Sequence, residues 1–355
     1  MRIGIYDPYL DDLGGGEKYM MTIAQILSHK NDVFIFWDNS KDLEPLKERF
    51  NIDLSRVKLT KNIFSGKTSF ISRLLESRKY DEIIILSDGS IPLLLSKKLF
   101  IHIQQPLQNV QSGNLKDKIK LTKVNSFFCN SLFTKSFVDK KFGTKTEVLY
   151  PPVDLKPKRV TKENMILHVG RFRVRSVGLD DYKKQRVMVK TFKELVDSSL
   201  KNWQFVLAVS VRESDAVEFD EFKETLAGYP IKFLINKSND ELWDIYSKAK
   251  IYWHASGYGE DLLMHPEFAE HFGISTVEAM GAGVVPVVIN AGGQKEIVTD
   301  GENGFLWDSL DELKNKTLKL VGNEELLKKM RVSAEKRAKD FSGERFEQQV
   351  EGMLG

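Results

Sequence analysis

The chain has few of the features that would place it outside the ordinary globular class. Its single cysteine, Cys129, excludes an internal disulfide and a thiolate metal site, and suits a reducing compartment. No apolar run approaches the roughly eighteen residues of a membrane-spanning helix. The first ten residues read as a strand rather than as a signal peptide. With 53 Lys and Arg against 50 Asp and Glu, the formal net charge of +3 does not indicate nucleic acid as a partner.

The 355 residues instead predict two α/β domains. Short apolar runs alternate with longer amphipathic segments, which favours parallel sheets covered on both faces. The expected strands of the first half are Arg2–Tyr6, Asp32–Trp37, Glu82–Leu86, Leu99–Ile103, Ser126–Cys129 and Glu147–Tyr150. Those of the second half are Met165–Gly170, Phe205–Val209, Ile231–Ile235, Ile251–His254, Val284–Ile289 and Gly304–Trp307.

A proline-rich connection separates the two halves. Tyr150–Asn164 holds three prolines, which neither a helix interior nor a central strand accepts. We therefore expect domains at 1–154 and 155–340. The segment 341–355 reads as a C-terminal helix that packs back on the first domain.

The first strand exits into a run of glycines. Gly14, Gly15 and Gly16 let the backbone approach a ligand closely, and a helix beginning near Glu17 would point its N–H groups at an anion. The spacing does not fit a dinucleotide fingerprint, and "SGKTS" at residues 65–69 lacks the earlier glycine of a phosphate-binding loop. A turn without a ligand stays open as the alternative.

Cations follow the first strand of the second half. Arg171 stands at the strand end, and Lys183 and Lys184 precede a helix expected to begin near Gln185. The planar guanidinium of an Arg, the ammonium of a Lys and the N–H groups of a helix N-terminus together suit a diphosphate. The alternative is a solvated basic loop.

Two acids flank a glycine corner in "EHFGISTVE". If a helix begins near Ile274, after Gly273, the N–H groups near Ser275 form an anion pocket with Glu270 before it and Glu278 one turn inside. Acids beside an anion must accept hydrogen bonds from groups attached to it, such as sugar hydroxyls. Two incidental surface carboxylates are the alternative.

Taken together, these motifs resemble those of the retaining glycosyltransferases of sequence family four, which have the GT-B fold of two facing Rossmann-like doubly wound domains with a cleft between them. The matching elements are "LGGGE", "NSLFTKSF", "YPPVD", "VGR", "KKQ", "WHASGYGE", "EHFGISTVE" and "AGGQKEIVTDGENGFLW". The resemblance covers nearly the whole chain.

The resemblance implies a role for each matching residue. Glu270 would contact hydroxyls of the transferred sugar and Glu278 would hold the nucleotide ribose. Arg171 and Lys183 would neutralise the leaving diphosphate, with Lys184 as the other candidate for the lysine role. The donor would also be bound by four residues of the corner motif and by two glycines of the first domain, with a strand-end histidine near the reacting sugar: Phe272, Gly273, Ile274 and Ser275; Gly15 and Gly16; and His102.

The implied activity is transfer of a hexose from GDP-mannose or a UDP-hexose to a glycan or a lipid-linked acceptor. The resemblance implies retention of configuration with neither metal nor cofactor. We interpret Asp11, Asp12, Asp180 and Asp181 as solvated loop acids. A zinc cluster of His265, Glu267, Glu270 and His271 is disfavoured by its spacing and by Pro266. A nucleotide-sugar-binding protein without turnover and a nucleotide-sugar epimerase are the alternatives.

The prediction about the acceptor depends on one basic segment. Asn114–Val124 combines lysines with Leu115, Ile119 and Leu121. It would lie on an anionic membrane that carries a lipid-linked acceptor, or it is a plain solvated helix. The localisation expected is cytoplasmic, and under the first interpretation peripheral at the inner face of the membrane.

Overall fold

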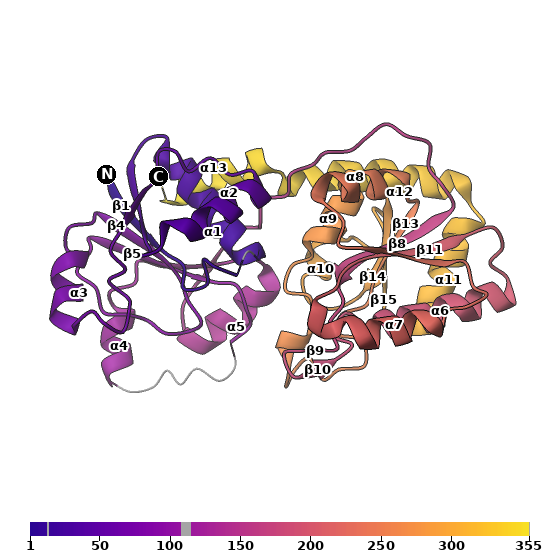
Figure 1. The fold of residues 1–355 in the computed structure, drawn as a ribbon, viewed down its shortest axis with the longest axis horizontal. Coiled ribbons are helices and arrows are strands. Elements are labelled where there is room, and N and C mark those ends of the chain that lie inside the picture. The colour runs from indigo at the N-terminus through magenta and orange to yellow at the C-terminus, as the bar shows by residue number, and fades with distance from the viewer. Residues whose placement is uncertain (13, 108–114, 355) are drawn as a thin grey trace. The chain divides into compact units, whose positions relative to one another are not determined.

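A computed structural model describes residues 1–12, 14–107 and 115–354, which form two compact units (Figure 1). Unit 1 comprises Met1–Pro152 and the C-terminal segment from Gly343, and unit 2 comprises Val153–Ser342. The sequence places these boundaries after residues 154 and 340. Each unit has its own sheet and its own core, and each is described by itself.

Unit 1 is built on a seven-stranded sheet whose neighbouring strands are all parallel, in the order β3-β2-β1-β4-β5-β6-β7. The strands are β1 (Arg2–Tyr6), β2 (Asp32–Phe36), β3 (Lys58–Thr60), β4 (Glu82–Leu86), β5 (Lys98–Ile103), β6 (Ser126–Cys129) and β7 (Glu147–Val148). Ile84 and Leu86 of β4 enter one core cluster, and Ile83 and Ile85 enter another. Burial on both faces explains why this strand is apolar throughout.

The helices of unit 1 lie between and after its strands, and several of them contribute to the two cores. They are α1 (Gly15–Ser28), α2 (Leu43–Phe50), α3 (Phe70–Ser77), α4 (Leu115–Leu121), α5 (Leu132–Phe142) and α13 (Gly343–Leu354), with a 3-10 turn at Ser40–Asp42. The last helix, α13, packs against α1, and Phe346, Val350 and Leu354 join the cluster that holds Ile3 and Ile5. The end of the chain therefore completes the core of the first unit.

Unit 2 repeats the parallel plan with six strands, in the order β12-β11-β8-β13-β14-β15. They are β8 (Met165–Arg171), β11 (Gln204–Ser210), β12 (Ile231–Ile235), β13 (Ile251–His254), β14 (Val285–Ile289) and β15 (Phe305–Trp307). The helices are α6 (Gln185–Ser198), α7 (Ala216–Glu224), α8 (Asn239–Lys248), α9 (Ile274–Gly281), α10 (Gln294–Ile297), α11 (Leu310–Val321) and α12 (Glu324–Ala338). Short 3-10 turns occur at Glu213–Asp215, Pro266–Phe268 and Lys339–Phe341.

The expected fold class is confirmed, since both units are α/β with parallel sheets. Three short elements were not anticipated: β3, and the antiparallel hairpin of β9 (Arg175–Ser176) and β10 (Leu179–Asp180). These pieces are two or three residues long, too short to show a periodic pattern. The first helix was expected near Glu17 and begins at Gly15, because the glycines belong to its first turn.

The structure also bears on the membrane question. Within residues 1–12, 14–107 and 115–354, no helix is both long and apolar enough to cross a bilayer. The basic segment expected at Asn114–Val124 forms α4 over Leu115–Leu121, while Asn114 lies outside the described residues.

Candidate active site

The expected site residues of unit 2 gather where two neighbouring strands end. Arg171 is the exposed last residue of β8, and His254 is the buried last residue of β13. Because β8 and β13 are adjacent and parallel, both ends lie at one edge of the sheet. Glu270 lies in the loop before α9. In α/β sheets this carboxyl edge is where ligands bind.

Lys183 and His254 approach the same oxygen of Glu270. The Lys183 Nζ lies 2.6 Å from Glu270 Oε2, and the His254 Nε2 lies 3.0 Å from it. The side chains of Lys183 and Glu270 are 14% and 20% exposed, so the ion pair is shielded but a ligand can still touch it. The second carboxylate oxygen, Oε1, takes part in neither contact.

The protonation states of this triad follow from its surroundings. Burial raises the pKa of the Glu270 carboxyl, but the Lys183 ammonium and the hydrogen bond from His254 outweigh burial and hold that pKa well below its usual range. Burial lowers the pKa of the His254 ring, with Glu270 opposing the shift. We therefore assign a neutral His254 whose Nε2–H donates to an ionised Glu270.

The corner before α9 takes the expected form. Gly273 precedes the helix with φ of 122°, a conformation that favours glycine, and the helix begins at Ile274. Both Thr276 and Val277 donate their N–H groups to the Gly273 carbonyl. The N–H groups of Ile274 and Ser275 precede these bonds, as the free donors of a helix N-terminus do. This geometry suits an anion.

A second glycine pair fixes the loop that carries Glu270. A Cβ on Gly292 would lie 2.3 Å from the Glu270 carbonyl oxygen, and one on Gly293 would lie 2.4 Å from the Phe272 Cα. The Gly293 N–H donates to the Glu270 carbonyl at 2.8 Å. Phe272 itself is 3% exposed, and its ring packs against Phe341. Phe272 therefore anchors the loop from within the core.

Hydroxyl groups support the other side of α9. Tyr246, which is buried on α8, donates from its hydroxyl to Glu278 Oε2 at 2.8 Å. The Tyr252 hydroxyl and the Ser275 Oγ lie 2.7 Å apart. Glu278 is half-buried, one turn inside the helix as expected. Its carboxylate is held in place by a partner that sequence patterns did not indicate.

One expectation about α6 was wrong. The sequence placed the N-terminus of this helix under a diphosphate, but Asp181 occupies it: its Oδ1 accepts from the Gln185 N–H at 2.8 Å and its Oδ2 from the Arg186 N–H at 3.1 Å. Asp181 is half-buried and caps the helix, so it is not the solvated loop acid that we expected. The N–H groups that it fills are the ones that a ligand would need.

The two neighbouring lysines point to different acids. Lys183 pairs with Glu270, whereas the Nζ of Lys184 lies 2.5 Å from Glu260 Oε1. Lys184 adopts a left-handed backbone conformation, with φ of 55°, at the residue just before α6. This left-handed residue lies between the Lys183 side chain and the helix. The sequence favoured Lys183 over Lys184, and the geometry gives the two lysines different partners.

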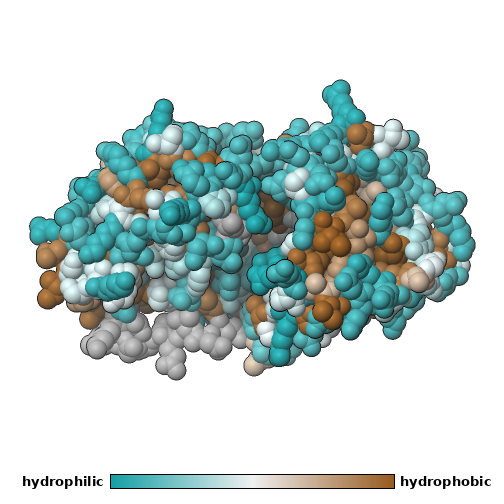
Figure 2. All heavy atoms as spheres, in the orientation of Figure 1, coloured by the Kyte–Doolittle hydropathy of each residue, from teal (hydrophilic) through white to brown (hydrophobic). Residues whose placement is uncertain are grey.

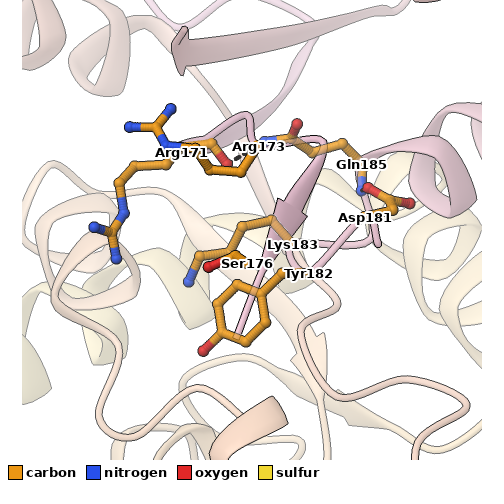
Figure 3. Close-up of a pocket in the computed structure, with 7 residues that line it drawn as sticks. All are labelled: Arg171, Arg173, Ser176, Asp181, Tyr182, Lys183 and Gln185. Carbon is orange, nitrogen blue, oxygen red and sulfur yellow. Dashed lines mark hydrogen bonds between the residues drawn. The ribbon is translucent and has the colours of Figure 1, made fainter. Parts of the chain in front are cut away.

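Arg171, Lys183 and Tyr182 also line a pocket, shown in Figure 3 with Arg173, Ser176, Asp181 and Gln185. Of these, Arg173 serves the fold, since its Nη1 donates to the Ser210 carbonyl at 2.9 Å. Lys183 also lies 5.0 Å from the centre of the Tyr182 ring, a cation–π contact. In the described part of the chain, His, Cys, Asp and Glu side chains form no group of three that would hold a metal ion.

The glycines of unit 1 lie at the start of α1, and an acidic residue of the same helix accepts a hydrogen bond from one of them. Gly15 and Gly16 are its first two residues, and a Cβ on Gly16 would lie 2.4 Å from the Gln104 Oε1. The Gly14 N–H donates to Glu17 Oε2 at 2.6 Å, and Glu17 is buried. Part of this helix end is therefore capped from within.

His102 is completely enclosed in unit 1. Its ring stacks on Tyr19, with centroids 4.4 Å apart, and on Phe128, at 4.8 Å, and it is 0% exposed. Its Nδ1 lies 3.2 Å from the Phe128 carbonyl oxygen. Burial lowers the pKa of the ring to about 3. In this structure His102 offers no surface to a ligand.

Sequence patterns missed one member of the triad and two buried polar residues near it. His254 holds Glu270, and His168 Nδ1 lies 3.0 Å from the Trp253 carbonyl oxygen, with its ring 6.1 Å from that of His254. Gln294 is 0% exposed beside Gly273. The signal available was a histidine within "MILHVGR" and another at the end of "IYWH", two largely apolar strands.

Fold and site together define a class of protein, and comparison with known families agrees with them. The family model described as glycosyl transferases group 1 matches residues 154–337, more than half of the 355 residues. The chain therefore belongs to this family. The match lies within unit 2, which carries the triad and α9.

Relatives of known name support the same family. A GDP-Man:Man(3)GlcNAc(2)-PP-Dol alpha-1,2-mannosyltransferase of Dictyostelium discoideum is 28% identical over 65% of this chain and 46% of its own length. The chain thus spans less than half of that relative. An uncharacterized glycosyltransferase of Methanocaldococcus jannaschii is 27% identical over 96% of this chain and 93% of its own.

Solved structures share the fold along the whole chain. HepE of Anabaena, solved in complex with UDP and glucose, has a TM-score of 0.73 at 19% identity and covers 100% of this chain and 99% of its own. Sucrose-phosphate synthase of Thermosynechococcus elongatus has a TM-score of 0.68 at 14% identity, with 100% and 98% covered. The fold class is that of the GT-B glycosyltransferases.

Proposed function

We propose that the protein is a hexosyltransferase that moves a sugar from a nucleoside-diphosphate donor, GDP-mannose or a UDP-hexose, to a glycan or lipid-linked acceptor. The observation that carries the proposal is the Lys183–Glu270–His254 triad beside the free N-terminus of α9, in a chain of this family. The names of the relatives support a GDP-mannose donor, and the UDP bound to HepE supports a UDP-sugar.

The donor's diphosphate would lie at the start of α9. The N–H groups of Ile274 and Ser275 supply donors there, and the Lys183 ammonium and the exposed Arg171 supply positive charge. Lys183 already stands in place through its ion pair with Glu270, so little side-chain entropy would be lost when a phosphate takes over part of its charge. Glu278, held by Tyr246, would accept hydrogen bonds from the ribose.

Glu270 would bind the transferred sugar rather than act as a nucleophile. Its Oε2 is already engaged by Lys183 and His254, which leaves Oε1 to accept from sugar hydroxyls. With one oxygen held by the protein and the other by the sugar hydroxyls, the carboxylate would be engaged in binding rather than aimed at carbon. The acceptor would therefore attack from the face that the diphosphate leaves, with retention of configuration.

The charge that develops in the reaction determines what the site must do. When the bond to the diphosphate breaks, negative charge grows on the leaving phosphate, and donors already aimed at it stabilise the transition state. In unit 2, Lys183, Arg171 and the N–H groups at the start of α9 supply the positive charge and the donors that stabilise it. The role of a metal would be redundant beside these cations, so we propose transfer without one.

Three predicted roles belong to unit 1. Gly15 and Gly16 would approach the donor with their backbone, and His102 would lie near the reacting sugar. For His102, the enclosure between Tyr19 and Phe128 requires that the ring act through its neighbours or that those neighbours move.

In unit 2, Lys184 stays the second candidate for binding the diphosphate, although its side chain is already paired with Glu260.

The proposal is tested by incubating the protein with GDP-mannose, UDP-glucose and UDP-N-acetylglucosamine, with and without a polyprenyl-diphosphate-linked acceptor and with EDTA. We expect nucleoside diphosphate release that requires an acceptor, survives EDTA and yields a product with the donor's anomeric configuration by NMR.

The other outcomes separate the alternatives. Donor binding without turnover of any donor and acceptor pair would indicate a nucleotide-sugar-binding protein. Isomerisation of the donor in the absence of acceptor would indicate an epimerase. Product of inverted configuration, or activity lost in EDTA and restored by a divalent cation, would contradict the proposed mechanism.

A further inference from the structure

Helix α3 of unit 1 turns its apolar side to solvent. Phe70, Ile71 and Leu75 are 56%, 69% and 59% exposed. Ile71 and Leu75 are one turn apart, and Arg78 follows at the spacing that continues their stripe. Helices on the surface of globular proteins normally bury their apolar stripe, so α3 is inverted. We refer to Ile71, Leu75 and Arg78, together with the exposed Phe70 at the start of the helix, as the α3 outer face.

Polar contacts fix this orientation. On the opposite side of the helix, Arg73 donates from Nε to the Ile63 carbonyl at 3.0 Å, with its guanidinium 5.9 Å from the centre of the Phe64 ring. Ser77 is 0% exposed, and its Oγ accepts from the Leu95 N–H at 2.9 Å. Rotation that buried the apolar stripe would break these contacts. The fold therefore presents the α3 outer face.

The chain around the α3 outer face is cationic. Residues 61–79 carry five Lys and Arg against one acid, which is Glu76. Arg78 and Lys79 are both exposed, and Lys79 forms an ion pair with Glu76 at 2.8 Å. Figure 2 shows hydrophobic atoms among hydrophilic ones at the border of unit 1 where Figure 1 places α3. Apolar side chains surrounded by cations are the composition that an anionic lipid surface binds.

The basic helix α4 lies on the same side of the sheet as α3. Leu121 and Val124, at and after its end, pack on the core cluster that also receives Phe64, which precedes α3. Ile119 is 51% exposed, between exposed Lys118 and half-buried Lys120. The second element therefore repeats the chemistry of the first on the same face of the sheet.

We propose that unit 1 docks on anionic lipid bilayers through the α3 outer face, with its apolar side chains at the level of the headgroups and Arg78, Lys79 and α4 contacting lipid phosphates. Three apolar side chains on a helix of eight residues give weak, reversible binding, which anionic lipid strengthens. Docking would bring the protein to a lipid-linked acceptor, and that consequence rests on the proposed function. The docking itself does not.

The test compares two double variants of the full chain. Ile71→Ser with Leu75→Ser removes the centre of the α3 outer face. Val217→Ser with Val332→Ser removes two valines, 69% and 66% exposed, on α7 and α12 of unit 2 and serves as the matched control. Each protein is cosedimented with vesicles of phosphatidylcholine alone or mixed with phosphatidylglycerol, without donor or acceptor, at low and high salt.

We expect the unaltered protein and the control to bind the phosphatidylglycerol vesicles equally, and the α3 variant to bind at least about tenfold less. Binding should weaken on pure phosphatidylcholine and in high salt. Changing Arg78 and Lys79 to Ser should lower affinity roughly fivefold for each charge.

Three results would overturn the proposal: no cosedimentation of the unaltered protein, equal binding by the α3 variant, or light scattering that shows a dimer which only the α3 variant loses. The last would make the α3 outer face an interface between copies. Because neither donor nor acceptor is present, none of these results bears on sugar transfer.

Discussion

The two units share an architecture but treat polar groups at their strand ends in opposite ways. His102 near the end of β5 and His254 at the end of β13 are both buried. The ring of His102 is closed in by Tyr19 and Phe128, whereas that of His254 holds Glu270 and, through it, Lys183. A parallel sheet therefore provides the place for a site, and the partners at the strand ends decide whether one forms.

The buried acids show the same contrast. Asp7, at the end of β1, is 1% exposed, and burial without a cation raises its pKa to about 7. Glu270 in unit 2 is also removed from most solvent, but Lys183 and His254 keep its pKa well below the usual range. Asp7 therefore keeps its proton below a pH of about 7, whereas Glu270 stays charged, which is the state in which its carboxylate accepts hydrogen bonds from sugar hydroxyls.

The largest expected effect separates two adjacent lysines. Lys183→Ala should lower kcat/KM by about 100-fold or more, the typical result of removing one donor from a developing charge. Lys184→Ala breaks an ion pair of similar burial on the same turn and should cost at least about tenfold less. Steady-state kinetics on both, with exposed Lys190→Ala as control, decides between them; a larger loss for Lys184→Ala would reverse the assignment.

In unit 1 the expected effect is on stability. His102→Ala deletes a ring packed between two aromatics and should lower the free energy of unfolding by about 2–4 kcal/mol. His29→Ala, at an exposed histidine of the same unit, should change it by less than about 0.5 kcal/mol. Urea unfolding measures both. If His102→Ala is as stable as His29→Ala yet inactive, the ring acts in catalysis and the contrast between the two histidines fails.

His254 should act by positioning Glu270. His254→Ala frees the carboxylate to rotate, and a misplaced group commonly lowers turnover by about 10- to 100-fold. His254→Gln keeps an N–H donor and should recover part of the loss. The measurement is kcat at saturating donor for both variants, and the comparison shows whether His254→Gln restores part of the turnover that His254→Ala loses. If His254→Ala, His254→Gln and the unaltered protein have equal kcat, His254 does not position Glu270 for the reaction.

The last prediction is a pH slope of the free energy of unfolding that comes from Asp7 and is small within any one pH unit. In the unfolded chain this carboxyl loses its proton near its ordinary value, 3.8, whereas in the fold it keeps the proton to about 7. The folded state binds more protons in between, so stability should fall as pH rises from about 4 to 7, by at most about 1.4 kcal/mol for each pH unit. Asp7→Asn should flatten this slope, and identical slopes would show that Asp7 titrates normally.

Much of the fold was readable from apolar strands. Glu82–Leu86, Ser126–Cys129 and Ile231–Ile235 match their strands at both ends, because short, mostly apolar runs between polar turns leave few alternatives. β3 and the β9–β10 hairpin are too short to show periodicity. The start of α9 was also predicted correctly, since Gly273 before a run of helix formers is a local signal.

The parts of the site that escaped prediction depend on contacts distant in sequence. Nothing local states that His254 meets Glu270, sixteen residues away across a loop. The Asp181 cap was missed because an acid before a helix reads equally as solvated loop. Spacing favoured Lys183 over Lys184 but did not show that the two side chains take different partners, with a left-handed backbone at Lys184.

Calorimetric titration of GDP and UDP into the unaltered protein, Lys183→Ala and Lys190→Ala tests the central claim that the end of β8 and the start of α9 hold a nucleoside diphosphate. The account predicts that one diphosphate binds the unaltered protein and Lys190→Ala alike, and that Lys183→Ala binds it at least about tenfold more weakly. Equal affinity for all three proteins, or no binding of either nucleotide, would contradict it.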